Sequence, residues 1–150
     1  MLNLNKKIVV AIDGSPQSDK AAEEAVRMAT LSGSRIKSHI YAVLVLPKSD
    51  TPAVIDYLPD ADMPLMPDRE EIRKRMFYVI EKSAREADVE FESVIAYGEP
   101  ADEIIRLAEE KECDVIVIGS SGKGRVKRAL RGSVSIDVAL NAHISVYVVR

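Results

Sequence analysis

Apolar residues recur along the chain in two alternating patterns, which predict strands and helices in turn. Five short runs rich in β-branched residues are typical of strands buried on both faces of a parallel sheet; they span 7–12, 36–46, 91–97, 115–118 and 146–149. Four segments with apolar residues at helical spacing lie between them, at 18–33, 68–87, 101–111 and 133–142. Strands that alternate with helices imply right-handed crossovers and a parallel sheet between two helical layers. The pattern therefore predicts one doubly wound α/β domain over residues 1–150, with a five-stranded parallel sheet flanked by four helices.

The segment Lys48–Pro67 interrupts this alternation. It carries four prolines and four aspartates, and it has no helical or strand periodicity. Loops of this length inside a compact domain are either functional or solvated. We interpret the segment as an irregular solvated excursion, with a lid or a partner-docking role as the alternative.

Composition and charge narrow the class of protein. Hydrophobic residues make up 47% of the chain and charged residues 30%, as in an ordinary globular domain rather than a disordered or fibrous chain. The net charge of -3 gives no general attraction to nucleic acid or anionic lipid, so any anion site must be local. A single cysteine, Cys113, excludes an intramolecular disulfide and a cysteine-rich zinc site. We expect a cytoplasmic protein without an exported or membrane-embedded segment.

A glycine- and serine-rich segment follows the fourth predicted strand. From Gly119 to Ser135 it holds four glycines, four serines and five cations, and no acidic residue occurs between Asp114 and Asp137. In an open parallel sheet, ligands lie outside the carboxyl ends of the strands, where the strand order reverses. Glycine backbone N–H groups and a helix N-terminus favour phosphate there. The alternative is a plain turn with solvated cations; the segment is neither a Walker A loop nor a GxGxxG motif.

Four residues of this segment have a distinctive spacing. Gly119, Gly122, Gly132 and Ser133 form the series Gly, two residues, Gly, nine residues, Gly-Ser, and the opening Ile8–Ser15 is an apolar strand that ends in an aspartate. Both features resemble the ATP-binding branch of the universal stress protein family, and the order of elements is similar over essentially the whole chain. The resemblance implies a single three-layer, Rossmann-like domain related to the adenine nucleotide alpha hydrolases, with strand order 3-2-1-4-5.

The resemblance also implies a binding site for ATP, with Mg²⁺ or Mn²⁺ carried on the phosphates rather than in a protein cage. Residues at the first two strands would lie near adenine and ribose, namely Ala11, Ile12, Asp13 and Val43, the last through its backbone. Residues after the fourth strand would line the ribose and phosphates, namely Gly119, Ser120, Gly122, Gly132, Ser133 and Val134. Lys123 and Ser135 are further candidates for phosphate contacts. Asp13 has a second interpretation, because an aspartate after a strand often caps the following turn.

Nucleophilic or acid–base catalysis finds little support in the sequence. His39 and His143 lie at predicted element ends without a motif that pairs them with a serine or a metal, and we expect both to be structural. Cys113 lies among acidic residues, which raise the pKa of a thiol and make it a poor nucleophile.

We therefore expect a nucleotide-dependent regulatory or signalling module in the stress response, with slow or no hydrolysis. A Mg²⁺- or Mn²⁺-dependent ATPase or phosphotransferase is the alternative, and it requires a positioned general base. An adenylating enzyme of the PP-loop type would need a different loop after the first strand, and a nucleic-acid role for 123–131 lacks aromatic residues among the cations. Family members commonly pair through their last strands, so the resemblance implies a homodimer through Ser145–Arg150, with an unknown protein partner that responds to the nucleotide.

Overall fold

The fold is a parallel sheet with helices on both faces. The computed structural model describes residues 6–31, 37–46, 48, 68–120 and 134–150. Its five strands are β1 (Lys7–Ala11), β2 (His39–Leu46), β3 (Glu90–Tyr97), β4 (Val115–Gly119) and β5 (Ser145–Val149). All neighbouring pairs are parallel, and the strand order is β3-β2-β1-β4-β5. The predicted fold class and strand order are confirmed.

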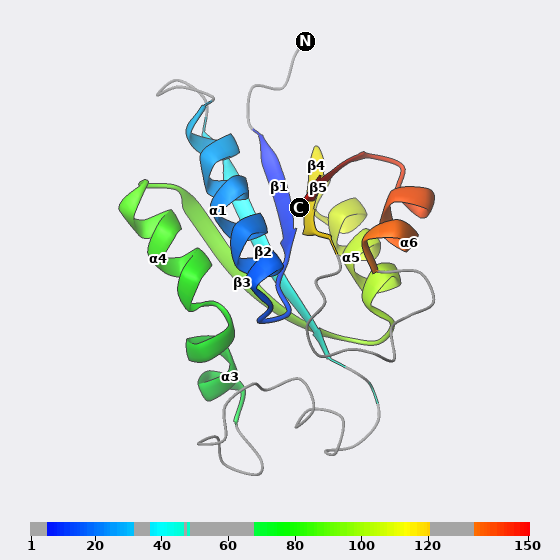
Figure 1. Ribbon diagram of the computed structural model, residues 1–150, viewed down its shortest axis with the longest axis horizontal. Coiled ribbons are helices and arrows are strands. Elements are labelled where there is room, and N and C mark those ends of the chain that lie inside the picture. Colours follow the sequence, from blue (N-terminus) through cyan, green and yellow to red (C-terminus); the bar gives the residue numbers. More distant parts are fainter. Residues whose placement is uncertain (1–5, 32–36, 47, 49–67, 121–133) are drawn as a thin grey trace.

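Two helical layers cover the sheet (Figure 1). Helices α1 (Pro16–Thr30), α3 (Arg69–Met76) and α4 (Tyr78–Glu86) lie on one face, and α5 (Pro100–Glu110) and α6 (Val134–Asn141) lie on the other. The single helix expected over 68–87 is thus two helices in the described part of the chain. The break falls at Phe77, which has φ -100° and ψ 7° and a side chain only 1% exposed. Hydrogen bonds from Phe77 N–H to Arg73 (3.1 Å) and from Glu81 N–H to Phe77 (2.9 Å) continue across it, so the chain bends to bury the ring without separating the helices.

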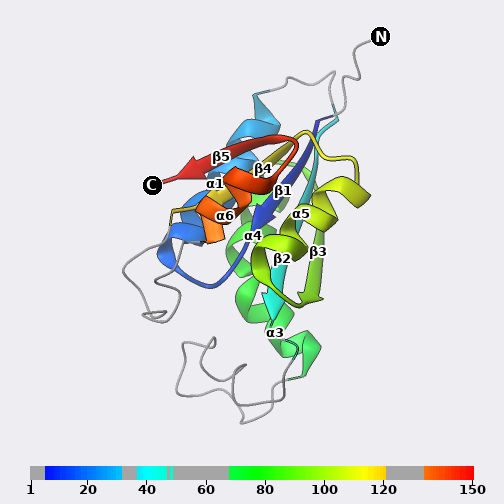
Figure 2. The ribbon, with the colours of Figure 1, turned by 90° about the vertical axis from the view of Figure 1, so that its right-hand side faces the viewer.

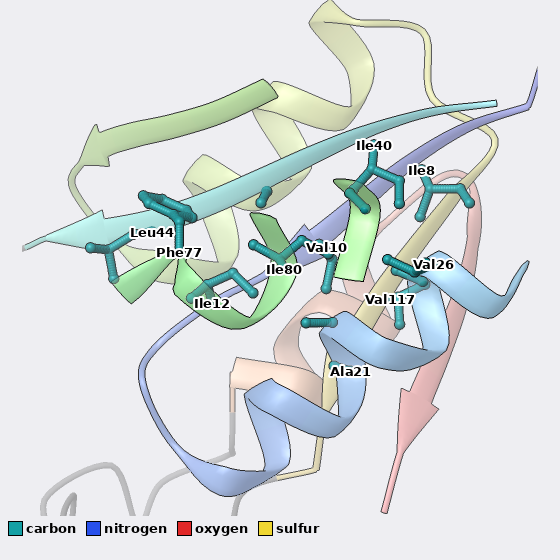
Figure 3. Close-up of a cluster of buried hydrophobic side chains, with 14 of the residues drawn as sticks. Ile8, Val10, Ile12, Ala21, Val26, Ile40, Leu44, Phe77, Ile80 and Val117 are labelled. Atoms are coloured by element: carbon teal, nitrogen blue, oxygen red, sulfur yellow. The ribbon is translucent and has the colours of Figure 1, made fainter. Parts of the chain in front are cut away.

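The central strands of the sheet contribute side chains to two hydrophobic cores, one on each face. Ile8, Val9 and Val10 of β1 are all 0% exposed, and they alternate between the two faces. The first core lies between the sheet and α1, α3 and α4, and Figure 3 shows Phe77 and Ile80 directed from the helical layer toward the strand side chains. The second core lies under α5 and α6. Burial of one Val or Ile side chain contributes about 1.5–3 kcal/mol, which explains the continuous apolar runs.

The first helix begins earlier than the sequence predicts. Ser15 is its N-cap, and the Ser15 hydroxyl accepts a hydrogen bond from Ser18 N–H at 3.1 Å. Pro16 therefore takes the first helical position, where its missing N–H costs nothing. The connection between β1 and α1 is short as a result, and the N-terminus of α1 lies at the carboxyl edge of the sheet.

The strand order reverses between β1 and β4. From β1 the chain proceeds to β2 and β3 on one side, and β4 and β5 complete the sheet on the other, so that β3 and β5 form its two edges (Figure 2). The carboxyl ends of β1 and β4 therefore frame the place where ligands bind in sheets of this kind. In the described ranges, no helix is both long enough and apolar enough to cross a membrane.

Candidate functional site

The turn after β1 holds Asp13 at the carboxyl edge. Its exposed carboxylate accepts a hydrogen bond from Ser15 N–H (2.8 Å at Oδ1), and Asp13 N–H donates to Ser18 Oγ at 3.2 Å. These bonds are those of an aspartate that caps a turn, the second interpretation given above. Among the described contacts the turn engages only Oδ1, and the residue is exposed. Asp13 is thus fixed in place by the turn.

At this edge the backbone of β2 is hydrogen-bonded to β1 on one side and to β3 on the other. Ile12 N–H donates to the Val43 carbonyl at 2.8 Å, and Gly98 N–H donates to the Leu46 carbonyl at 2.9 Å. Backbone groups of successive strand residues alternate between the two neighbouring strands, so Val43 faces β1 and Leu46 faces β3. By the same alternation Val45 faces β1, but β1 has already turned away at Asp13, whose N–H bonds Ser18. Among the described hydrogen bonds, Val45 has no backbone partner on β1, so its backbone is a further candidate for ligand contact in addition to that of Val43.

Gly119 ends β4 directly against the first turn of α1. A Cβ at Gly119 would lie 2.7 Å from both the carbonyl carbon and the oxygen of Gln17, far inside van der Waals contact. The next residue, Ser120, donates its N–H to the Val149 carbonyl of β5 at 2.6 Å. The sequence attributes Gly119 to an anion site, but close packing of α1 against β4 is by itself enough to require glycine there.

The remaining residues of the expected phosphate site divide into two groups. Gly122, Lys123, Gly132 and Ser133 lie outside the described residues. Val134 and Ser135 form the first turn of α6, where Val134 packs against the second core and Ser135 is 6% exposed. The start of α6 and the end of β4 both lie at the carboxyl edge, on the far side of β1 from β2.

Charge is unevenly distributed along this edge. Burial raises the pKa of Asp19 in the first turn of α1, and the neighbouring carboxylates of Glu23 and Asp13 raise it further. The carboxylates of Asp13, Asp19 and Glu23 gather near the N-terminus of α1 and would repel an anion that the helix dipole alone would favour. The side formed by β4 and α6 has no acidic residue from Val115 to Ile136, and it is where a phosphate group would meet least repulsion.

The other candidate groups lie away from this edge. His39 begins β2 at the opposite edge, where its Nδ1 lies 3.4 Å from Glu90 Oε2 and its ring lies 4.4 Å from that of Tyr41. Cys113 precedes β4 at the same edge, and burial raises the pKa of its thiol to about 11. The raised pKa was expected, but burial contributes more to it than the acidic neighbours do. No group of three or more metal-binding side chains occurs among the described residues.

Comparisons with known proteins identify the family and agree with the fold. A sequence model of the universal stress protein family matches residues 4–150. The universal stress protein MJ0531 of Methanocaldococcus jannaschii is 36% identical over 148 residues, which cover 99% of this chain and 84% of that protein. Among solved structures, MJ0577 of the same organism has a TM-score of 0.70 at 24% identity, with 96% of this chain and 94% of that chain covered. The universal stress protein of Archaeoglobus fulgidus in complex with dAMP has a TM-score of 0.66 at 24% identity, with 97% and 98% covered. A family match over nearly the whole length, together with a relative of this identity, shows that the chain belongs to the universal stress protein family.

Proposed function

We propose that this chain binds an adenine nucleotide at the carboxyl edge of its sheet, with ATP as the working ligand. The observation that carries the proposal is the edge itself. A fixed, exposed aspartate follows β1, the neighbouring strand β2 has backbone at Val45 without a described partner on β1, and a segment without acidic residues follows β4. The solved relative from Archaeoglobus fulgidus is in complex with dAMP, and two other structures of this fold are in complex with cAMP and AMP. These ligands share adenine, ribose and phosphate, which is the chemistry that the edge offers.

The proposed orientation follows from the charges. Adenine and ribose lie at Asp13 and at the backbone of β2, at Val43 and Val45. The phosphates lie between the end of β4 and the start of α6, away from Asp13 and Asp19. Gly122, Gly132 and Ser133 contribute backbone N–H groups to them, with Lys123 as a countercharge. On this orientation Mg²⁺ or Mn²⁺ is held through the phosphates.

The module acts as a nucleotide-dependent regulator in the stress response, in the cytoplasm, and hydrolysis is slow or absent. A true ATPase would need a general base placed at the γ-phosphate. Asp13 is engaged in its turn, and on the proposed orientation it lies at the nucleoside end. A protein partner that distinguishes the occupied from the empty site completes the function.

Two measurements test this proposal. The purified protein is denatured and any released nucleotide is identified by chromatography; we expect an adenine nucleotide. Turnover of ATP is then followed with Mg²⁺ or Mn²⁺ in the wild type and in Asp13→Ala. Rapid turnover that disappears in an Asp13→Ala variant still able to bind ATP would replace the regulator with an ATPase or phosphotransferase.

The edges of the sheet favour one route to a homodimer. At the β3 edge, Arg73 Nη1 donates to the Ser93 carbonyl at 2.9 Å, which occupies a backbone acceptor that a new strand would need. At the β5 edge, Tyr147 and Val148 are 41% and 42% exposed. An apolar edge strand of this kind pairs readily with another strand. We propose that two copies associate through Ser145–Arg150.

A further inference from the structure

Helix α3 covers the turn that holds Asp13. Gly14, the residue after Asp13, has φ +78°, and a Cβ there would lie 3.0 Å from Met76 Cε and 3.4 Å from its Sδ. The methyl group of Met76 thus fills the space that a side chain at position 14 would take. Met76 is 7% exposed and belongs to the same core as Ile12, so it contacts the turn from inside the molecule. In Figure 1, β1 and β2 run toward the end of the molecule where α3 lies.

Helix α3 is itself tied to the far edge of the sheet. Arg73 donates from Nη1 to both the carbonyl and the hydroxyl oxygen of Ser93 on β3, and the carbonyl lies at 2.9 Å. A charged donor on two acceptors is stronger than an ordinary hydrogen bond. Arg73 lies less than one helical turn from Met76, and its neighbour Ile72 is 4% exposed in the first core. The helix has eight residues, so these few contacts determine where it lies.

We propose that α3 is a positioning element for the nucleotide site, in which Met76 holds the Asp13–Gly14 turn and Arg73 holds α3 against β3. Met76 and Arg73 are positioning residues, since their effect on a ligand passes through Asp13. The effect on affinity rests on the proposed nucleotide function. The link between α3 and the turn exists without ligand and can be tested separately.

This arrangement has a specific consequence for binding. A loosened turn misplaces Asp13 and so disturbs the nucleoside end of the ligand, while the phosphate end between β4 and α6 stays intact. AMP and ATP should therefore lose affinity by the same factor. Damage to the phosphate end would instead weaken ATP more than AMP.

The test uses four variants of the full chain. Met76→Ala removes the contact with the turn, and Arg73→Gln removes the anchor on β3 while leaving the core intact, so it remains informative if Met76→Ala does not fold. Met28→Ala is the matched control for the first, because Met28 packs partly buried against the same core from α1. Arg85→Gln is the control for the second, because Arg85 pairs with Glu81 on the exposed face of α4.

Two quantities are measured in each variant. NMR amide hydrogen exchange in the absence of nucleotide reports on the Asp13, Ser15 and Ser18 N–H groups, which make the hydrogen bonds of the turn. Calorimetry gives the Kd of AMP and of ATP. We expect faster exchange and an increase in both Kd values of about three- to tenfold in Met76→Ala and Arg73→Gln, the usual range for residues that act at a distance. The two controls should match the wild type.

The outcomes separate this proposal from the proposed function. Exchange at the turn that is the same in Arg73→Gln as in Arg85→Gln overturns the link between α3 and the turn. Faster exchange with unchanged Kd values overturns the positioning role, and a larger loss for ATP than for AMP does the same. A wild type that binds neither nucleotide refutes the proposed function, while the exchange data still decide whether α3 holds the turn.

Discussion

Gly119→Ala tests whether the close packing of α1 against β4 requires that residue 119 has no side chain. The added methyl group would lie 2.7 Å from the carbonyl carbon and oxygen of Gln17 and 2.9 Å from its Cβ. Carbon atoms in contact are normally about 3.5–4.0 Å apart, so the first turn of α1 must move by about 1 Å. Two of the three atoms in the way are backbone atoms, which no side-chain rotation can remove. Overpacking of this kind costs about 1–3 kcal/mol.

Thermal unfolding followed by circular dichroism measures this effect. At this chain length 1 kcal/mol shifts Tm by about 2–4 °C, so Gly119→Ala should lower Tm by about 2–12 °C. Ser120→Ala is the control, since it keeps the backbone bond to Val149 and should stay within about 0.5 kcal/mol of the wild type. The shifted turn also carries the hydrogen bonds of Asp13, so nucleotide affinity should fall in Gly119→Ala. A Tm within about 1 °C of the wild type would refute the packing argument.

Four further predictions concern the phosphate site, the buried thiol and the β5 edge. Gly132→Val should abolish nucleotide binding in calorimetry with an unchanged Tm, because it places a side chain where phosphate is proposed to lie; binding by the folded variant would remove this residue from the site. Cys113, with its pKa raised from 9.0 to about 11, keeps its proton in the folded chain where the unfolded chain loses it, so the free energy of unfolding should fall as pH rises from about 9 toward 11. Its thiol should react with a thiol reagent at pH 8 only after denaturation, and equal rates in both states would contradict the burial argument. Val148→Lys should convert the proposed dimer to a monomer in sedimentation velocity, and an unaffected dimer would exclude the β5 edge.

The fold class could be predicted from the sequence because the patterns of the five strands are clear. Continuous β-branched runs such as Ile8–Ile12 need cover on both faces, which only a sheet between two helical layers supplies. The bend at Phe77 could not be seen, since the apolar spacing of Ile72, Met76 and Ile80 continues through it as in one helix. The bend follows from where the Phe77 ring is buried, which is a property of the tertiary structure.

The sequence predicts a binding site at the carboxyl edge of the sheet, and which backbone groups are open at that edge depends on the register of the strands. The point at which β1 leaves the sheet determines which residues of β2 have backbone groups without a partner on β1. The spacing of residues along the sequence does not give that point. Gly119 matches a phosphate signature, yet a side chain there would collide with Gln17, which lies about a hundred residues away in the sequence. Met76 looked like an ordinary core residue of a helix. Its contact with the turn after β1 had no local signal, because the two meet only in the folded chain.

Calorimetric titration of the nucleotide-free protein with ATP and, separately, with GTP in the presence of Mg²⁺ tests the central claim most directly. We predict saturable binding of ATP at one site per chain and much weaker binding of GTP, since we propose that Asp13 and the open backbone of β2 recognise the nucleoside. Equal affinity for ATP and GTP would contradict recognition of adenine at this edge. No heat of binding with either nucleotide would contradict the nucleotide site as a whole.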